Sequence, residues 1–308
     1  MKDYRVLLFY KYVAIPDAEA FAAEHLRYCQ ELGIKGRILI ANEGINGTLS
    51  GTVEQTERYM TDMHGHPLFE DLLFKVDDSN GHAFKKLFVR HKKELVTLRY
   101  DQKLDPNTDG GGRLSPVEFQ QYLQRDDVIV LDGRSGYEYD LGHFRNAIRP
   151  DVDSFREFPD WLRDNMEQHK DKTIITYCTG GIRCEMLTAV MRKEGFEDVY
   201  QLDGGIVTYG KDPVTQGRLF DGNCYVFDER ISVPINHTDE NVVVGTCYHC
   251  GQPSENYINC ADDTCHRQHL CCDACQAEYE GYCSEECRQH DWPPRQQPVN
   301  KAVIAHDG

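Results

Sequence analysis

Residues 173–183 read Thr-Ile-Ile-Thr-Tyr-Cys-Thr-Gly-Gly-Ile-Arg, which places a cysteine directly after a short β-branched and aromatic run. Such a run is typical of a buried parallel strand. Residues 185–194 predict a helix that ends at Gly195. Cys178 therefore lies in a loop between the carboxyl end of a strand and the start of a helix, where backbone N–H groups and the helix dipole favour negative charge.

A cysteine in this loop is expected to have a lowered pKa and to be largely thiolate, the nucleophilic form. Arg183 closes the loop with a full positive charge. We predict that Cys178 is the catalytic nucleophile and that Gly180, Gly181 and Arg183 form a cradle for an anion or a persulfide sulfur. The paired glycines and the arginine disfavour the alternative, a structural cysteine after a core strand. Cys184 is either a resolving thiol that attacks an oxidised or persulfidated Cys178, or a small residue turned toward the core.

The length of the chain and its number of cysteines limit which class of protein it can be. The 308 residues suffice for two or three domains, and no apolar run reaches the roughly 20 residues of a membrane span. The N-terminus leads directly into a strand pattern, so we expect neither a signal peptide nor a membrane partner. Thirteen cysteines without a secretory signal favour metal binding and a reactive thiol over a disulfide framework, and they indicate the cytoplasm.

The chain is expected to be an α/β protein, or more broadly a multidomain α+β protein. The order of its expected strands and helices divides it into successive domains. The first part has the order βαββαβ with one added strand, which predicts a ferredoxin-like (acylphosphatase-like) sandwich. The central part alternates strands and helices, which predicts a parallel sheet with its ligand site at the carboxyl ends of the strands. The expected boundaries are 1–100 for the sandwich, 101–114 for a linker, 115–215 for the central domain, 216–245 for a connecting segment, 246–290 for a cysteine-rich zinc module and 291–308 for a flexible tail.

Within the first hundred residues, Asp17 and Thr52 are expected to begin the two helices. The turn at residues 42–47 either forms a hairpin that uses Asn and Gly for positive φ, or contacts a ligand. We expect helices at 18–32 and 52–63, strands at 5–12, 36–41, 74–76 and 95–98, and a further strand after a turn at 44–51.

One basic patch stands out in a chain whose net charge is −17. Residues 1–100 carry 14 Lys and Arg against 14 Asp and Glu, so the acidic excess lies after residue 100. Five basic residues of this neutral part lie close together without an acid between them: Lys85, Lys86, Arg90, Lys92 and Lys93. This patch is the candidate phosphate-binding surface for a nucleic acid, and a solvated face is the alternative.

Four cysteine pairs follow within about forty residues. They are Cys247 and Cys250, Cys260 and Cys265, Cys272 and Cys275, and Cys283 and Cys287. Because two thiolates at such spacing reach one tetrahedral Zn²⁺, we predict two zinc ions, with the first pair joined to the third and the second to the fourth. Cys271, His266 and His269 could substitute as ligands. Closed all-cysteine sites leave no position for substrate, so the zinc is expected to be structural, and the module could also bind a partner or contact RNA.

Three motifs of the central domain resemble those of rhodanese domains. They are Asp-Gly-Arg at 132–134 with Glu138 and Gly-His-Phe-Arg-Asn-Ala at 142–147, the cysteine loop at 178–183, and Leu-Asp-Gly-Gly-Ile at 202–206. The resemblance implies that Cys178 is the sulfur-carrying nucleophile and forms a persulfide. It also implies that Asp132 and Arg134 tie the first strand to the loop.

The sequence of the cysteine loop differs from the loops of two related classes of enzyme, the thiosulfate-using rhodaneses and the phosphatases. Thr179 stands where many thiosulfate-using rhodaneses carry a basic residue, which disfavours simple thiosulfate:cyanide transfer. Four residues separate Cys178 from Arg183, whereas related phosphatase loops use five. The shorter loop would crowd a phosphate but leaves room for a sulfur atom.

Together with residues 83–87 and 89–96, the three parts closely resemble the bacterial tRNA uridine hydroxylase family over residues 5–290. This resemblance implies oxygen-dependent formation of 5-hydroxyuridine at the wobble position of tRNA, with Cys178 essential. It implies tRNA, through its anticodon loop, as partner and molecular oxygen as co-substrate. The sequence contains no flavin or nicotinamide motif.

Our mechanistic hypothesis is that the uracil is flipped or already single-stranded. Cys178 would either attack C6 of this base or act through an oxidised or persulfidated form, and so activate C5 toward oxygen. Arg183 and loop N–H groups would stabilise the developing charge. The alternative function is a sulfurtransferase or persulfide carrier. A third, a redox-sensing interaction module, is disfavoured by the intact Cys178 loop.

Overall fold

The computed structural model describes residues 2–265 and 267–289. Its contacts divide the chain into two compact units, residues 1–245 and 246–308. The first unit contains both the N-terminal sandwich and the central parallel-sheet domain, and the second begins where the sequence predicts the cysteine-rich module. The expected tail at 291–308 and the candidate ligand His266 lie outside the described residues.

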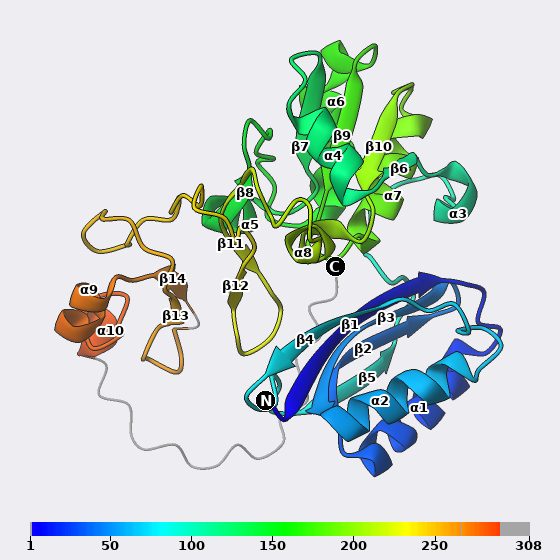
Figure 1. Ribbon diagram of the computed structural model, residues 1–308, viewed down its shortest axis with the longest axis horizontal. Coiled ribbons are helices and arrows are strands. Elements are labelled where there is room, and N and C mark those ends of the chain that lie inside the picture. The colour runs from blue at the N-terminus through cyan, green and yellow to red at the C-terminus, as the bar shows by residue number, and fades with distance from the viewer. Residues whose placement is uncertain (1, 266, 290–308) are drawn as a thin grey trace. The chain divides into compact units, whose positions relative to one another are not determined.

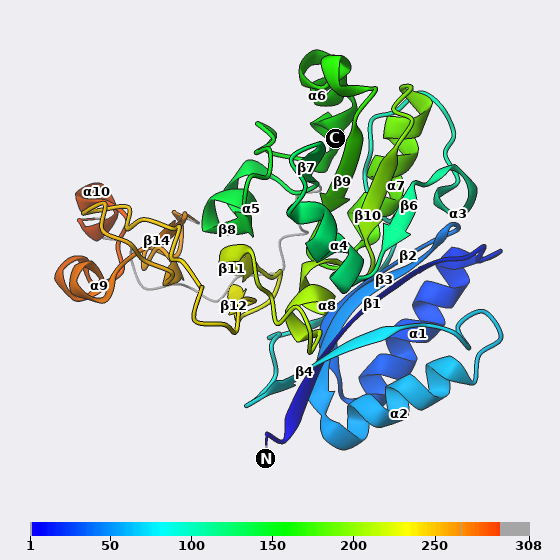
Figure 2. The same ribbon diagram turned by 45° about the horizontal axis from the view of Figure 1, so that its top comes forward.

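The N-terminal part is a five-stranded sheet in the order β4-β1-β3-β2-β5, with both helices on one face (Figure 1, Figure 2). This order is the ferredoxin-like topology with β5 added parallel to β2, so the fold expected from the sequence is confirmed. The elements are β1 (Tyr4–Tyr12), α1 (Ala18–Leu32), β2 (Lys35–Ala41), β3 (Gly44–Thr52), α2 (Val53–His64), β4 (Phe74–Ser79) and β5 (Leu87–His91).

Local sequence signals set the ends of both helices. The Asp17 carboxylate accepts a hydrogen bond from the N–H of Ala20, and Gly33 ends α1 in the left-handed region at φ 77°. Thr52 and Gln55 form a reciprocal capping box at the start of α2. These caps lie where the sequence predicts them.

Two strand predictions in this part are wrong. Residues 95–98 are irregular, because Leu95 packs into a cluster with Tyr12 and Met186 and its N–H donates to the Glu43 carboxylate rather than to a strand. The additional strand is instead β5, whose Val89 packs on the core. Residues 44–51 are not a turn but part of β3, and the turn comprises residues 42 and 43 alone.

The central domain is built on a four-stranded parallel sheet in the order β6-β10-β9-β7. The three strands expected from continuous apolar runs are all present. The sheet strands are β6 (Gly112–Leu114), β7 (Val128–Asp132), β9 (Thr173–Tyr177) and β10 (Val199–Leu202). The helices are α3 (Pro106–Asp109), α4 (Pro116–Leu123), α5 (Gly136–Leu141), α6 (Phe158–Asn165), α7 (Ile182–Lys193) and α8 (Gly205–Lys211), with 3₁₀ turns at Phe155–Glu157 and Glu167–His169.

The expected linker and connecting segment both belong to this body. Residues 101–114 contain α3 and β6, and β6 pairs with the edge of β10 and buries Leu114. Residues 216–245 contribute β11 (Phe220–Tyr225), which pairs with β8 (Gly142–Phe144), and β12 (Ser232–Pro234). Gly- and Asp-rich composition suggested a free linker, but backbone pairing to an open sheet edge orders these segments.

The second unit has few regular elements. They are β13 (Tyr257–Asn259), β14 (Gln268–Leu270), α9 (Asp273–Tyr279) and α10 (Glu285–Arg288). Its buried cluster consists mainly of cysteines, with Cys247, Cys271 and Cys275 at its centre. None of the helices in the described ranges is long and apolar enough to cross a bilayer.

Candidate active site

The cysteine loop lies where β9 ends and α7 begins. Cys178 is 1% exposed, and the N–H of Gly181 donates to its Sγ at 3.1 Å. Gly181 occupies the position before α7 with φ 106°, a conformation that favours glycine. The start of α8 holds the other side of the loop, because the N–H of Ile206 donates to the Cys178 carbonyl at 3.0 Å. The loop carbonyls therefore point away from the sulfur while an N–H points toward it.

The environment of Cys178 stabilises its thiolate. Burial opposes ionisation, but the S–H of Cys184, the charge of Arg183 and the N–H groups of Cys184 and Gly181 together lower the pKa of Cys178 to about 5. The direction is the one expected from the loop sequence. At neutral pH the side chain is therefore a buried nucleophile held by donors.

Cys184 contacts Cys178 from the first turn of α7. It is fully buried, and both burial and the neighbouring Cys178 charge raise the pKa of the Cys184 thiol well above its usual value. It therefore stays protonated and donates to the Cys178 sulfur, a role that the sequence analysis did not consider. Its use as a resolving thiol stays a prediction.

Arg183 is held by a buried carboxylate. Its guanidinium donates to both oxygens of Glu138 at 2.7 and 2.9 Å and to the Thr179 hydroxyl at 3.2 Å. Glu138 is fully buried, and although burial opposes its charge, Arg183 lowers the pKa of this carboxyl. From the sequence, Glu138 is recognisable only as part of a motif, because its partner Arg183 lies 45 positions later in the chain.

The expected role of Asp132 and Arg134 is partly wrong. These two residues form a fully buried ion pair, but the second partner of Arg134 is the carbonyl of Gly142 at the start of β8. The guanidinium also lies over the Tyr177 ring. The pair therefore joins β7 to β8, and Glu138 rather than Arg134 holds the cysteine loop.

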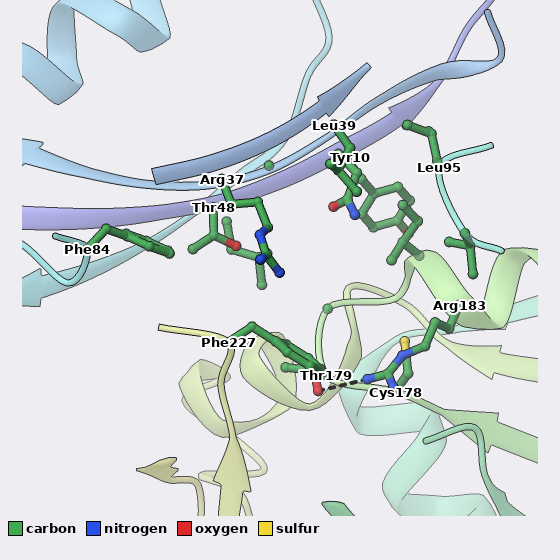
Figure 3. Close-up of a pocket in the computed structure, with 16 residues that line it drawn as sticks. Tyr10, Arg37, Leu39, Thr48, Phe84, Leu95, Cys178, Thr179, Arg183 and Phe227 are labelled. Atoms are coloured by element: carbon green, nitrogen blue, oxygen red, sulfur yellow. Dashed lines mark hydrogen bonds between the residues drawn. The ribbon is translucent and has the colours of Figure 1, made fainter. Parts of the chain in front are cut away.

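The N-terminal sheet closes the site from the other side (Figure 3). Cys178 opens onto a cavity of about 270 Å³ between the helix-free face of this sheet and the cysteine loop. Its wall on the sheet side comprises Leu8, Tyr10, Arg37, Leu39, Asn46, Gly47, Thr48, Phe84, Leu95 and Val96. Its wall on the other side comprises Cys178, Thr179, Gly180, Ile182, Arg183 and Phe227. The contribution of the N-terminal part to this pocket was not predicted from the sequence.

Polar contacts fix the sheet against the loop. Lys75 on β4 donates to the Gly180 carbonyl at 2.8 Å, and burial lowers the pKa of this lysine to about 8. The Tyr10 hydroxyl donates to Glu185 at 2.8 Å. Burial raises the pKa of Glu185, although its ion pair with Arg113 opposes the shift. Strands β4 and β1 of the N-terminal sheet thus contact the middle of the cysteine loop and the first turn of α7.

The basic patch lies on and beside the edge strand β5. All five of its side chains are exposed, Arg90 lies over the Phe88 ring at 5.0 Å, and Lys85 pairs with Glu229. Among the described residues that line the pocket, the cations are Arg37 and Arg183, so the patch lies outside the cavity. Arg37 was not singled out in the sequence, but it occupies β2, the strand that β5 pairs with.

The cysteine-rich unit gathers its thiols into two groups. Cys247, Cys250, Cys272 and Cys275 form one, and Cys260, Cys265, Cys283 and Cys287 form the other, in the interleaved order of the sequence prediction. Within each group the ligand atoms lie within 4.8 Å of one another, so each could bind a metal ion. His269 and Cys271, considered as substitute ligands, form a separate group with His249.

Comparison with known proteins agrees with this architecture. Residues 4–95 match the UPF0176 acylphosphatase like domain, residues 115–212 the rhodanese-like domain, and residues 221–288 the rhodanase C-terminal family. The chain is 59% identical to a Bacillus licheniformis protein named tRNA uridine(34) hydroxylase, over 94% of this chain and 89% of that protein. Proteins of the same name from Bacillus velezensis and Bacillus cereus are 55% and 53% identical, over 94% and 99% of this chain and 90% and 93% of theirs. By fold, by its cysteine loop and by these relatives, the chain belongs to the tRNA uridine(34) hydroxylase family.

Proposed function

We propose that this protein hydroxylates C5 of the wobble uridine in the tRNA anticodon loop, with molecular oxygen as co-substrate. The observation that carries this proposal is the Cys178 thiolate at the wall of a cavity lined by aromatic and apolar side chains and two arginines. Its relatives bear the name of this activity. The comparisons do not favour the alternative of a plain sulfurtransferase.

The chemistry begins with addition of the Cys178 sulfur to C6 of uracil. The new S–C6 bond uses the sulfur electron pair, and the C5–C6 π pair moves onto C5 and the C4 carbonyl. Arg183 and the Gly181 N–H stabilise the Cys178 thiolate before the addition and again when it leaves. C5 becomes electron-rich, which makes it reactive toward oxygen.

The remaining steps balance with one oxygen molecule and an external two-electron donor. One oxygen atom is retained at C5, and the other leaves as water after taking up two electrons and two protons. Loss of the C5 proton then expels the Cys178 thiolate and restores the C5–C6 double bond. Because Cys178 is a good leaving group at its lowered pKa, the same property serves both addition and release.

We also propose that each four-cysteine group binds one structural Zn²⁺. Thiolates about 2.3 Å from a tetrahedral ion lie about 3.8 Å apart. The sulfur pairs Cys250–Cys272 and Cys283–Cys287 are both 3.7 Å apart. Such ions would stabilise a unit with little apolar core and would require the reducing cytoplasm. Elemental analysis of the purified protein should give two zinc ions per chain, and one or none would contradict this count.

The function is tested by nucleoside mass spectrometry of tRNA from cells that lack the protein. We expect the uridine derivative heavier by one oxygen atom to disappear, to return with the wild-type gene, and to stay absent with Cys178→Ser. Cys29→Ser is the matched control, since it removes a buried thiol of helix α1 that belongs to the core of the N-terminal part and not to the cysteine loop. Loss of a thiolated nucleoside instead would support the sulfurtransferase, and hydroxylation by Cys178→Ser would remove Cys178 from the chemistry.

A further inference from the structure

Two rows of side chains cross the helix-free face of the N-terminal sheet inside the pocket. The strand register aligns Tyr10 with Asn46 and Asn46 with Leu39, and in the next row Thr48 lies opposite Arg37. All of these residues line the cavity. Because side chains on one sheet face recur at every second position, Asn46 and Thr48 point the same way from β3. The central strand thus presents a carboxamide between two large apolar-bodied neighbours.

The Asn46 carboxamide is a polar group of the sheet wall without a hydrogen-bond partner in the described residues. It makes no hydrogen bond to any residue within 2–265 or 267–289, whereas the Asn42 amide of the same hairpin donates to the Ile15 and Pro16 carbonyls. The polar groups of the opposite wall are engaged, since Arg183 and Thr179 both bond to Glu138. A part-buried amide between Tyr10 and Leu39 that has no protein partner is available to a ligand that enters the cavity.

We propose that Asn46 binds the Watson–Crick edge of the target uracil and so aims its C5–C6 edge at Cys178. The proposal rests on the proposed function and deepens it by naming the residue that positions the base. Uracil presents an N3–H donor between two carbonyl acceptors. A carboxamide presents one acceptor and one donor side by side, so it pairs with N3–H and either carbonyl through two hydrogen bonds.

The position of Asn46 fits the geometry of the reaction. In the pyrimidine ring N3 lies directly opposite C6, so a group that binds the Watson–Crick edge fixes where C6 lies, while the sulfur adds to C6 from one face of the ring. Figure 3 shows the flanking residues Tyr10 and Leu39 on the sheet side of the cavity and Cys178 on the loop side. A base bound to Asn46 by its Watson–Crick edge would extend C6 toward the loop wall, where the Cys178 thiolate could reach one face of the ring.

The rest of the pocket suits a nucleotide. Phe84 and Phe227 offer aromatic faces on which an unstacked base or its neighbour can lie (Figure 3). The described lining contains two arginines and no acidic side chain, so it favours an anionic ligand. Arg37 lies in the row of side chains next to the row that contains Asn46. One nucleotide could therefore place its phosphate at Arg37 and its base at Asn46.

The test compares two full-length tRNA transcripts, one with uridine and one with 3-methyluridine at position 34. The methyl group removes the N3–H donor but leaves C5 and C6 unchanged. Single-turnover hydroxylation by wild type, Asn46→Ala and Asn42→Ala would be followed by nucleoside mass spectrometry. Asn42→Ala is the matched control, since it removes an amide from the same hairpin that points to backbone carbonyls instead of the cavity.

We expect wild type and Asn42→Ala to hydroxylate uridine about tenfold to a hundredfold faster than 3-methyluridine, in line with the worth of a bidentate contact. Asn46→Ala should be slower on uridine by a similar factor and should no longer distinguish the two substrates. Asn46→Asp, which is isosteric and can only accept, should lie between. The rate of Cys178 alkylation should be the same in Asn46→Ala and Asn42→Ala as in wild type, which separates base positioning from damage to the loop.

Full activity of Asn46→Ala on uridine would overturn the inference and leave the proposed function intact. So would a slow Asn46→Ala enzyme that still prefers uridine to 3-methyluridine, since that pattern marks a structural role. A wild-type enzyme that does not distinguish the substrates also overturns it. A wild-type enzyme inactive on uridine would instead refute the proposed function itself.

Discussion

The two walls of the pocket carry one arginine each, and the two arginines are held in opposite ways. Arg183 donates to both carboxylate oxygens of Glu138 and lies beside the Cys178 thiolate. Arg37 makes no ion pair within the described parts of the chain and is exposed on β2. A fixed cation tunes the chemistry of its neighbours, whereas a free one is available to a ligand. The loop wall therefore serves the reaction, and the sheet wall serves the substrate.

Removing Arg183 should have the largest effect on hydroxylation. It tests whether the loop wall serves the reaction. Without its charge, one of the interactions that lower the pKa of Cys178 is lost, so this pKa rises from about 5 and the thiolate forms at higher pH than in wild type. Arg183→Met should therefore move the midpoint of Cys178 alkylation by iodoacetamide upward and reduce hydroxylation at neutral pH by at least about a hundredfold.

Arg37→Met is the matched control for this experiment, because it removes an arginine from the same cavity but away from the sulfur. Its alkylation midpoint should equal that of wild type. An unchanged midpoint in Arg183→Met would show that the loop donors alone hold the thiolate. Arg183→Lys, which keeps the charge but loses the bidentate contact with Glu138, should lie between the two.

The comparison also explains what the sequence could and could not predict. The cysteine loop follows from residues 173–183 because strand, turn and helix start are local, and Gly181 is needed where φ is positive. Glu138 and Lys75 reach the same loop from 45 and 105 positions away, so no local pattern links them to it. The period of β3 predicts that Asn46 and Thr48 share a face, but not that a second domain covers that face.

The expected strand at 95–98 was wrong for a related reason. Its apolar residues do pack, but against Met186 of α7 and beside the pocket rather than in a sheet. Hydrophobic periodicity identifies a buried segment without identifying its partner. The basic residues of β5 were visible in the sequence, whereas Arg37 was not distinguished from any other exposed arginine until the pocket was known.

The smallest expected effects come from changing the cations that are proposed to bind tRNA phosphates. They compare Arg37 on the sheet wall with the basic patch outside the cavity. We propose that Lys85, Lys86, Arg90, Lys92 and Lys93 bind tRNA phosphates while Arg37 binds a phosphate inside the cavity. Each phosphate contact contributes roughly 0.7 to 0.9 to the slope of log K against log salt. Neutralising the patch should lower the measured slope by several such increments, and Arg37→Ala by about one.

The two changes should differ more clearly in catalysis than in binding. A patch that only concentrates tRNA should leave single-turnover rates at saturating enzyme unchanged, whereas Arg37→Ala should reduce them, because a phosphate near the reacting nucleotide helps to orient it. Binding that is unchanged by neutralising the patch would make it a solvated face, as the existing Lys85–Glu229 ion pair already makes part of it. Arg37→Ala with wild-type saturating rates would place the substrate phosphate elsewhere, and the division between a reaction wall and a substrate wall would then rest on Asn46 alone.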